Sequence, residues 1–205
     1  MKTVGTLILA ILVSVFFVVT SFAQIQNSKH DLSMGTGTAL EQEICAYCHT
    51  PHNAVEYEVG NSYPLWSMVT VADSAGYTEY SSPTLDGAIS DPLAGPSRLC
   101  MSCHDGTIAM DNAVDENPDR YMGAGSSANL GQDLSNDHPV GVVYESGDLE
   151  LQPISAALGT GVISDYLYDG LVTCASCHDV HAGENRMFLL QANTDSALCL
   201  ACHNK

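Results

Sequence analysis

The chain has few basic and few aromatic residues. Of its 205 residues, six are lysine or arginine, one is tryptophan and four are phenylalanine. Beyond position 23, five basic residues face 24 carboxylates: Lys29, Arg98, Arg120, Arg186 and Lys205. So acidic a surface repels phosphate backbones and excludes nucleic-acid binding. It favours solubility and cationic partners.

The chain also lacks long apolar runs, except for one near its start. Lys2 precedes the run Val4–Val19, and Ser21-Phe22-Ala23 follows it, which is typical of a signal peptide cleaved after Ala23. The run has about 16 residues, whereas a spanning helix needs about 20. An uncleaved anchor is the alternative. We expect residues 1–23 to be removed and residues 24–205 to form one exported domain with no membrane span.

No cysteine lies outside one repeated pattern, Cys-x-x-Cys-His. Four such pentads hold all eight cysteines: Cys45-x-x-Cys48-His49, Cys100-x-x-Cys103-His104, Cys174-x-x-Cys177-His178 and Cys199-x-x-Cys202-His203. Ordinary composition would give about 0.01 pentads by chance in a chain of this length. In an exported protein the pattern indicates haem c, whose porphyrin is bound to both thiols through thioether bonds and whose iron is bound by the histidine. We therefore predict four covalently attached haems c.

Paired cysteines also occur in disulfide frameworks and in zinc sites built from Cys-x-x-Cys units. Neither a disulfide framework nor a zinc site requires histidine to follow the second cysteine in all four cases. Covalent haem attachment requires both cysteines and the histidine together.

The histidines divide into two equal groups. His49, His104, His178 and His203 belong to the pentads and are predicted proximal iron ligands. The other four are predicted distal ligands: His30, His52, His138 and His181. Two protein ligands per iron leave no open position for a substrate, so the count favours electron transfer over catalysis. Methionine is the rival distal ligand, with candidates Met34, Met68, Met101, Met110, Met122 and Met187.

The positions of the four spare histidines suggest how each could reach an iron. His52 and His181 each follow a pentad histidine by three residues, too close to reach the other face of the same porphyrin, so we expect each to serve a neighbouring haem. His138 precedes Pro139, which holds the segment extended. His30 lies near the start of the mature chain and could bind an iron of its own chain or of the next subunit.

The expected fold is mostly irregular, with short helices wrapped round a tetrahaem stack. The mature chain supplies only about 45 residues per haem, too few for a conventional core around each. Thr38 is predicted to begin a helix that carries the first pentad, and Ser97 one that carries the second. Thr194-Asp195 is predicted to cap a final helix through Leu200, and residues 140–144 to be extended.

Several blocks resemble the paired Cys-x-x-Cys-His multihaem cytochromes. They are residues 44–54, Pro64-Leu65-Trp66, residues 97–106, residues 137–141 and residues 174–181. With four pentads and no lipid anchor, the chain is most similar to extracellular tetrahaem cytochromes that polymerise into filaments. The resemblance implies bis-histidine haems in a continuous stack and a homopolymer with haem contacts between subunits. It also implies that one subunit can donate a histidine to its neighbour, a role we transfer to His30.

The sequence leaves three possible functions open. The preferred one is a filament that conducts electrons to extracellular acceptors or redox partner proteins. The second is a soluble tetrahaem shuttle in the periplasm. The third is a multihaem reductase, which needs an iron with an open position and is disfavoured by the equal histidine groups.

Overall fold

The computed structural model describes residues 24–33, 43–50, 52, 54, 65–67 and 75–204. The predicted signal peptide, the predicted cap Thr38, and Met34 and Met68 lie outside these residues. Within the described part of the chain, no helix is both long and apolar enough to cross a bilayer.

Most of the described chain consists of turns and irregular segments, which confirms the predicted fold class. Among the described residues, the α-helices are α2 (Pro96–His104) and α3 (Ala197–Cys202). The 3₁₀ helices are η1 (Ile44–Tyr47), η2 (Ile163–Tyr166), η3 (Cys174–Ser176), η4 (Arg186–Phe188) and η5 (Thr194–Ser196).

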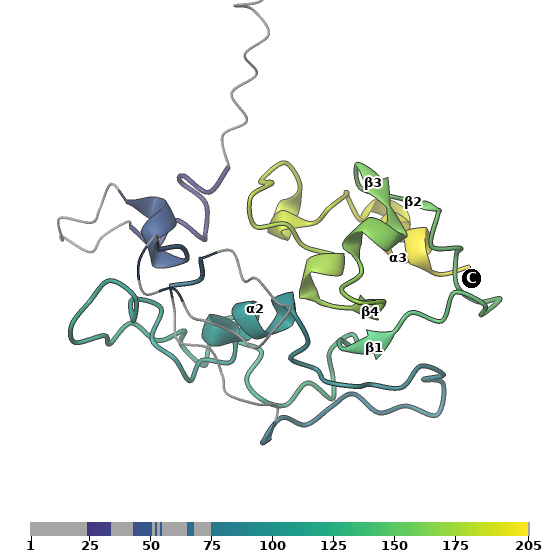
Figure 1. The fold of residues 1–205 in the computed structure, drawn as a ribbon, viewed down its shortest axis with the longest axis horizontal. Coiled ribbons are helices and arrows are strands. Elements are labelled where there is room, and N and C mark those ends of the chain that lie inside the picture. The colour runs from purple at the N-terminus through teal and green to yellow at the C-terminus, as the bar shows by residue number, and fades with distance from the viewer. Residues whose placement is uncertain are drawn as a thin grey trace, which may run out of the picture.

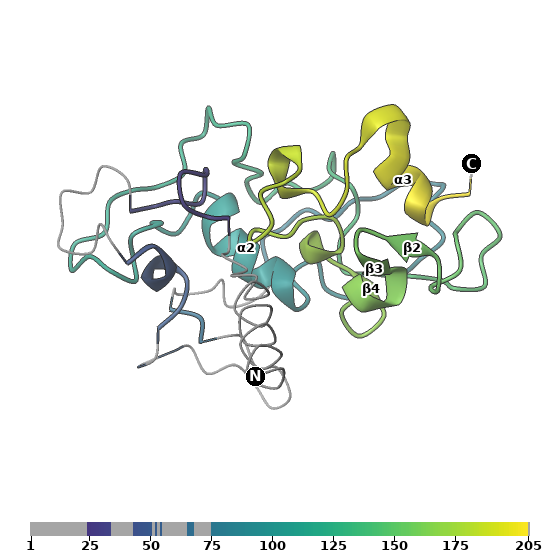
Figure 2. The same ribbon diagram turned by 90° about the horizontal axis from the view of Figure 1, so that it is seen from above.

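In the part of the chain that the structure describes, four very short strands form two antiparallel pairs. Strand β1 (Val142–Val143) pairs with β4 (Leu171–Val172), and β2 (Ala157–Leu158) pairs with β3 (Gly161–Val162) as a hairpin. The extended segment predicted at 140–144 is thus confirmed at Val142–Val143, whereas Gly141 has a positive φ of 72°. Figures 1 and 2 place α2 centrally, with η1 and residues 24–33 on one side and β2, β3 and α3 on the other.

The two predicted helix caps that fall on described residues are wrong in detail. Helix α2 begins two residues earlier than a Ser97 cap allows, because Pro96 is its first residue and Gly95 caps it. Proline suits that position, since its missing N–H would have no partner inside the helix. Thr194 and Asp195 form the separate turn η5, and Ser196 caps α3 in a left-handed conformation.

The hydrophobic core of the described residues is small and divided. One cluster joins Leu93, Met101 and Leu134, with Tyr77 and Val140 against it. The other centres on Tyr144, Leu158 and Ile163, which are 8%, 1% and 1% exposed. Met101 belongs to the first cluster and is 2% exposed, so it packs in the core. Two such clusters bury little apolar area for a chain of this length.

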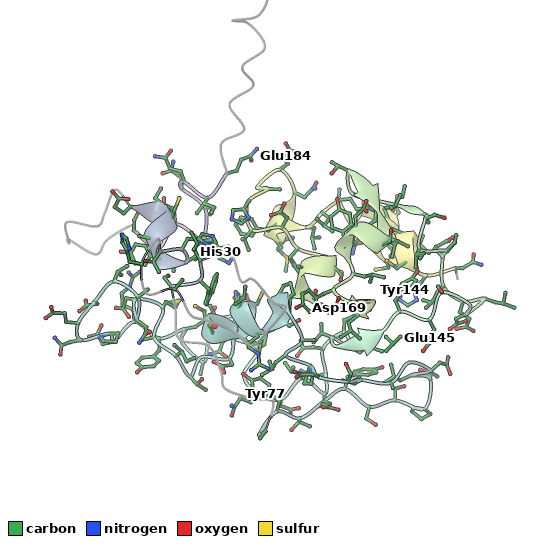
Figure 3. The ribbon with its side chains drawn as sticks, in the orientation of Figure 1. His30, Tyr77, Tyr144, Glu145, Asp169 and Glu184 are labelled. Carbon is green, nitrogen blue, oxygen red and sulfur yellow. The ribbon has the colours of Figure 1, made fainter. Side chains whose placement is uncertain are left out.

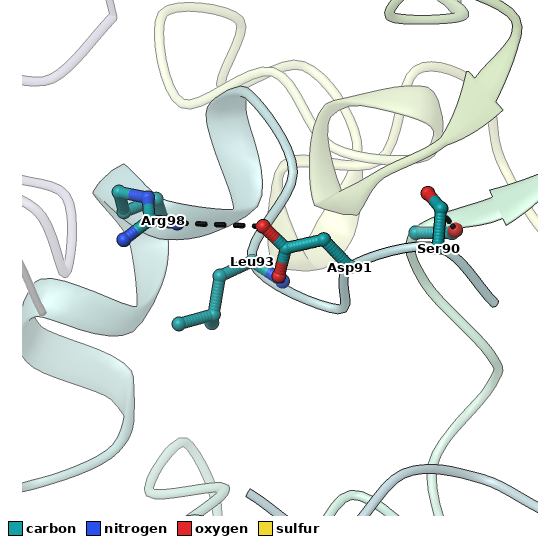
Figure 4. Close-up of polar contacts among 5 residues, drawn as sticks. Ser90, Asp91, Leu93 and Arg98 are labelled. Atoms are coloured by element: carbon teal, nitrogen blue, oxygen red, sulfur yellow. Dashed lines mark hydrogen bonds and ion pairs between the residues drawn. The ribbon is translucent and has the colours of Figure 1, made fainter. Parts of the chain in front are cut away.

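Polar contacts hold the loop that precedes α2. The carboxylate of Asp91 accepts the Leu93 N–H at 2.9 Å and lies 3.4 Å from the Arg98 guanidinium (Figure 4). The side chain of Arg98 is only 5% exposed. Ser90 donates its hydroxyl to the Gly141 carbonyl at 3.2 Å and so joins this loop to the segment just before β1.

Candidate functional site

Each pentad forms a single helical turn. In the first, the His49 N–H donates to the Cys45 carbonyl at 2.8 Å, and His178 and His203 bond back to Cys174 and Cys199 in the same way. The second pentad lies within α2. Residues three and four apart lie on the same face of a helix. Both thiols and the imidazole of a pentad therefore project from one side of the turn, as covalent attachment to one flat group requires.

The histidine at the end of each pentad makes backbone contacts with a second segment of the chain. Three of the pentad histidines form isolated β-bridges: His49 with Trp66, His178 with Leu189 and His203 with Leu151. The fourth, His104, accepts a hydrogen bond at its carbonyl from the Leu130 N–H at 2.7 Å. Each proximal histidine therefore has a backbone position set by residues outside its own pentad.

Backbone carbonyls also orient several imidazoles. Nδ1 of His104 lies 2.8 Å from the Ala128 carbonyl oxygen, and Nδ1 of His178 lies 2.8 Å from that of Met187. His138 makes the same contact with its neighbour Pro139 at 3.0 Å. A carbonyl only accepts, so Nδ1 must carry the proton and Nε2 keeps its lone pair. This is the usual arrangement of a metal-binding histidine, whose other ring N–H is held by an acceptor.

Three ring pairs each bring one pentad histidine to one spare histidine. The centroid distances are 6.0 Å for His30–His104, 6.2 Å for His49–His181 and 6.3 Å for His138–His203. The members of every pair come from distant parts of the sequence. The structure gives His52 as exposed.

Two aromatic side chains flank these pairs at their edges. Trp66 meets His49 at 6.1 Å with 86° between the rings, and Phe188 meets His30 at 4.7 Å with 72°. Trp66 thus packs against the first pentad. His30 lies on the segment 24–33 and faces the loop that carries Phe188 and Glu184 (Figure 3).

The eight cysteines, all of which lie in the described part of the chain, form no disulfide. Burial raises the pKa of Cys48 to about 11 and that of Cys103 to about 12. Burial and the nearby Cys202 raise the pKa of Cys177 to about 11. These thiols are therefore neutral at physiological pH and are poor thiolate nucleophiles.

Thiols of different pentads also lie close together. The Cys100 and Cys174 thiols share a hydrogen bond, which raises the pKa of Cys100 and lowers that of Cys174. The Cys174 N–H also donates to the Ser97 hydroxyl at 3.2 Å, so Ser97 joins α2 to η3 instead of capping its own helix. The Cys48 thiol is near enough to Cys103 to raise its pKa further. Successive pentads are therefore neighbours in space.

The described residues contain no disulfide and no group of three or more His, Cys, Asp or Glu side chains arranged to hold a bare metal ion. These residues do fit attached haem c, because each pentad presents two thiols outside any disulfide and one imidazole on one face. His30 fits as well: its Nδ1 is buried and has no hydrogen-bond partner, an uncommon state for a buried polar atom.

Residues 169–205 match the family model described as a doubled CXXCH motif. The match spans the third and fourth pentads. It supports a multihaem c-type cytochrome. Such a protein binds haem c covalently, and electron transfer is the function that this kind of protein suggests. No curated protein matches the chain.

Sequence reasoning missed the groups that hold and surround the imidazoles. The carbonyls of Ala128 and Met187 are backbone atoms, so no residue type marks them. Phe188 gave no signal either, because it is a single aromatic residue in an irregular segment. Trp66 was singled out in the block Pro64-Leu65-Trp66, but its contact with His49 was not predicted.

Proposed function

We propose that the chain is a tetrahaem c-type cytochrome that transfers electrons through four bis-histidine haems. The observation that carries this proposal is the set of three ring pairs, each joining a pentad histidine to a spare one. Held by two histidines, each haem c would supply one-electron redox chemistry and would leave no open position for a substrate. This disfavours the reductase alternative.

The roles of the protein residues follow from their placement. The thiols of each helical turn would hold the porphyrin edge, and the pentad histidine would bind the iron through Nε2. The Ala128 and Met187 carbonyls accept from Nδ1 of His104 and His178, which orients these rings and leaves Nε2 as the nitrogen for the iron. Close packing of successive pentads, as between Ser97 and Cys174, would keep the haems near one another.

Haem content and spin state test this function directly. The protein, expressed with a haem c maturation system, should carry four haems by pyridine haemochrome assay and intact mass. Electron paramagnetic resonance and resonance Raman spectra should show only low-spin ferric haem. Fewer than four haems would contradict the count, and a high-spin haem in the intact protein would favour a reductase.

We further propose that the protein acts outside the cytoplasmic membrane, as a polymerising extracellular conduit. The N-terminal sequence supports export, and the family resemblance supports polymerisation through contacts between haems of successive subunits. Electron microscopy of the secreted fraction tests this. Filaments are expected, and dispersed particles at all concentrations would contradict polymerisation.

One observation favours the second candidate, a soluble periplasmic shuttle. His30 lies against His104 of its own chain, so a single molecule could complete its own ligand set. Donation of His30 to another subunit stays a prediction that a single chain does not test. Fractionation of expressing cells separates the candidates, because a shuttle would be recovered as periplasmic monomers.

A further inference from the structure

We propose that the axial ligands pair within one chain as His30 with His104, His49 with His181 and His138 with His203, which assigns His52 to His178. This inference rests on the proposed function and specifies its ligand sets.

The ring distances match two imidazoles on opposite faces of one iron. Metal–imidazole bonds of about 2.0 Å place the two ring centres about 6.2 Å apart. The three observed distances are 6.0, 6.2 and 6.3 Å. Ordinary aromatic contacts cover a wider range, about 4.5–7 Å. Each pair also contains one pentad histidine and one spare histidine, as axial ligation requires.

The nitrogens of these rings are arranged for ligation. His104 and His138 both direct Nδ1 at a backbone carbonyl. Nδ1 of His181 lies 3.4 Å from the carboxylate of Asp179, which also accepts the His181 backbone N–H at 2.9 Å. In all three, the acceptor leaves Nε2 as the nitrogen with a free lone pair.

The segment that carries His30 is docked on its own chain. The Gln24 N–H donates to the His181 carbonyl at 2.9 Å, and Arg120 donates from Nη1 to the Leu32 carbonyl at 3.0 Å. Phe188 packs edge-on against the His30 ring. Chain termini are mobile unless tied down. These contacts attach residues 24–33 to the segments around Arg120 and His181. They bring His30 to His104 without a second subunit.

The spare histidine that follows the first pentad serves the third pentad, and the one that follows the third pentad serves the first. His181 follows the third pentad but faces His49 of the first. With the other six histidines paired, His52, which follows the first pentad, is left for His178 of the third. In both segments a pentad histidine and the spare histidine three residues after it therefore bind different irons, and this links the two haem sites.

The test uses the intact haem-loaded protein, held as a monomer by dilution and verified by analytical ultracentrifugation. His30→Ala should convert one haem of four to high-spin, and free imidazole should restore the low-spin signal. Phe188→Leu is the matched control, because it changes the packing of His30 and leaves the ligand in place. Four low-spin haems in the His30→Ala monomer would overturn the assignment.

A second experiment tests which iron His30 binds, whereas the first tests only whether His30 is a ligand. Replacing Cys100 and Cys103 with alanine removes the haem of the second pentad. In that background His30→Ala should add no high-spin haem, whereas His138→Ala should still add one. An extra high-spin haem on adding His30→Ala would show that His30 serves another iron.

A haem-loaded cryo-EM structure gives the same answer if the cysteine variant does not fold. It should show His30 and His104 of one chain on one iron, and a His30 donated from a neighbouring subunit would overturn the proposal. Haem content keeps the two proposals distinguishable. A chain without haem refutes the proposed function, whereas four haems with other pairings refute only this inference.

Discussion

The imidazole rings of His49 and His181 lie nearly parallel, with 6.2 Å between centroids and 23° between planes. His49 belongs to the first pentad, and His181 follows the third. A contact between these segments joins the N-terminal and C-terminal parts of the described chain. A change at His181 is therefore expected to affect the first haem site, although the residue lies beside the third.

Replacing His181 with methionine should raise the reduction potential of one haem. Methionine is a weaker donor to ferric iron than histidine, and axial ligands span about 0.8 V of haem potentials. We expect one of four potentials to rise by about 0.1 V or more in spectroelectrochemical titration. Glu184→Gln, an exposed change in the same loop, is the control (Figure 3). Four unchanged potentials would show that His181 is not a ligand.

Tyr144→Phe should destabilise the haem-loaded protein by about 1–2 kcal/mol. The Tyr144 hydroxyl lies 2.8 Å from the Gln152 carbonyl and 3.1 Å from the Cys202 carbonyl, and so ties the fourth pentad to the 144–152 loop. Denaturant unfolding followed by circular dichroism measures the loss. Tyr121→Phe is the control, since Tyr121 is 53% exposed. Equal stability of the two variants would contradict this role.

Ionisation of the Tyr144 hydroxyl should also lower the stability of the folded state at alkaline pH. Burial raises the pKa of Tyr144 to about 12, above its ordinary value of 10. The folded state therefore holds this proton more tightly than the unfolded state, so the associated stability is complete below pH 10 and is lost as pH rises towards 12. Unfolding free energies between pH 9 and about 12 should fall less steeply in Tyr144→Phe than in the wild type. Parallel curves would refute the assignment.

Gly141→Ala should be strongly destabilising, by about 1–3 kcal/mol or more. Gly141 has φ of +72°, and a Cβ there would clash with the Asp91 carbonyl oxygen. The residue follows His138-Pro139-Val140, so its displacement should also disturb the His138–His203 pair. Thermal unfolding and haem spin state are the measurements. Gly147→Ala is the matched control, because nothing lies within 4 Å of its added Cβ.

Without haem the chain should not fold cooperatively. The two core clusters are small, and a chain whose core is completed by a bound group loses that folding energy when the group is absent. Serine at all eight cysteines should abolish near-ultraviolet circular dichroism and the cooperative thermal transition. A sharp transition in this variant would show that the protein core alone is sufficient.

The sequence predicted the parts of the fold that depend on composition and local pattern. Low secondary structure was predicted from the small number of residues per haem, and extended backbone was predicted for residues 140–144, where Val142–Val143 form β1. The helix caps were predicted less well. At α2, Pro96 sets the first turn while the Ser97 hydroxyl receives the Cys174 N–H, a contact invisible to local rules.

The pentads and the two equal groups of histidines were determined by sequence alone, because attachment chemistry requires fixed residue types at fixed spacing. The pairing of the histidines was decided only by tertiary structure. His30 reaches His104, and His181 reaches His49, through contacts between segments far apart in the chain. Those contacts depend on carbonyl oxygens, one docked terminal segment and the close approach at Gly141, which no local spacing encodes.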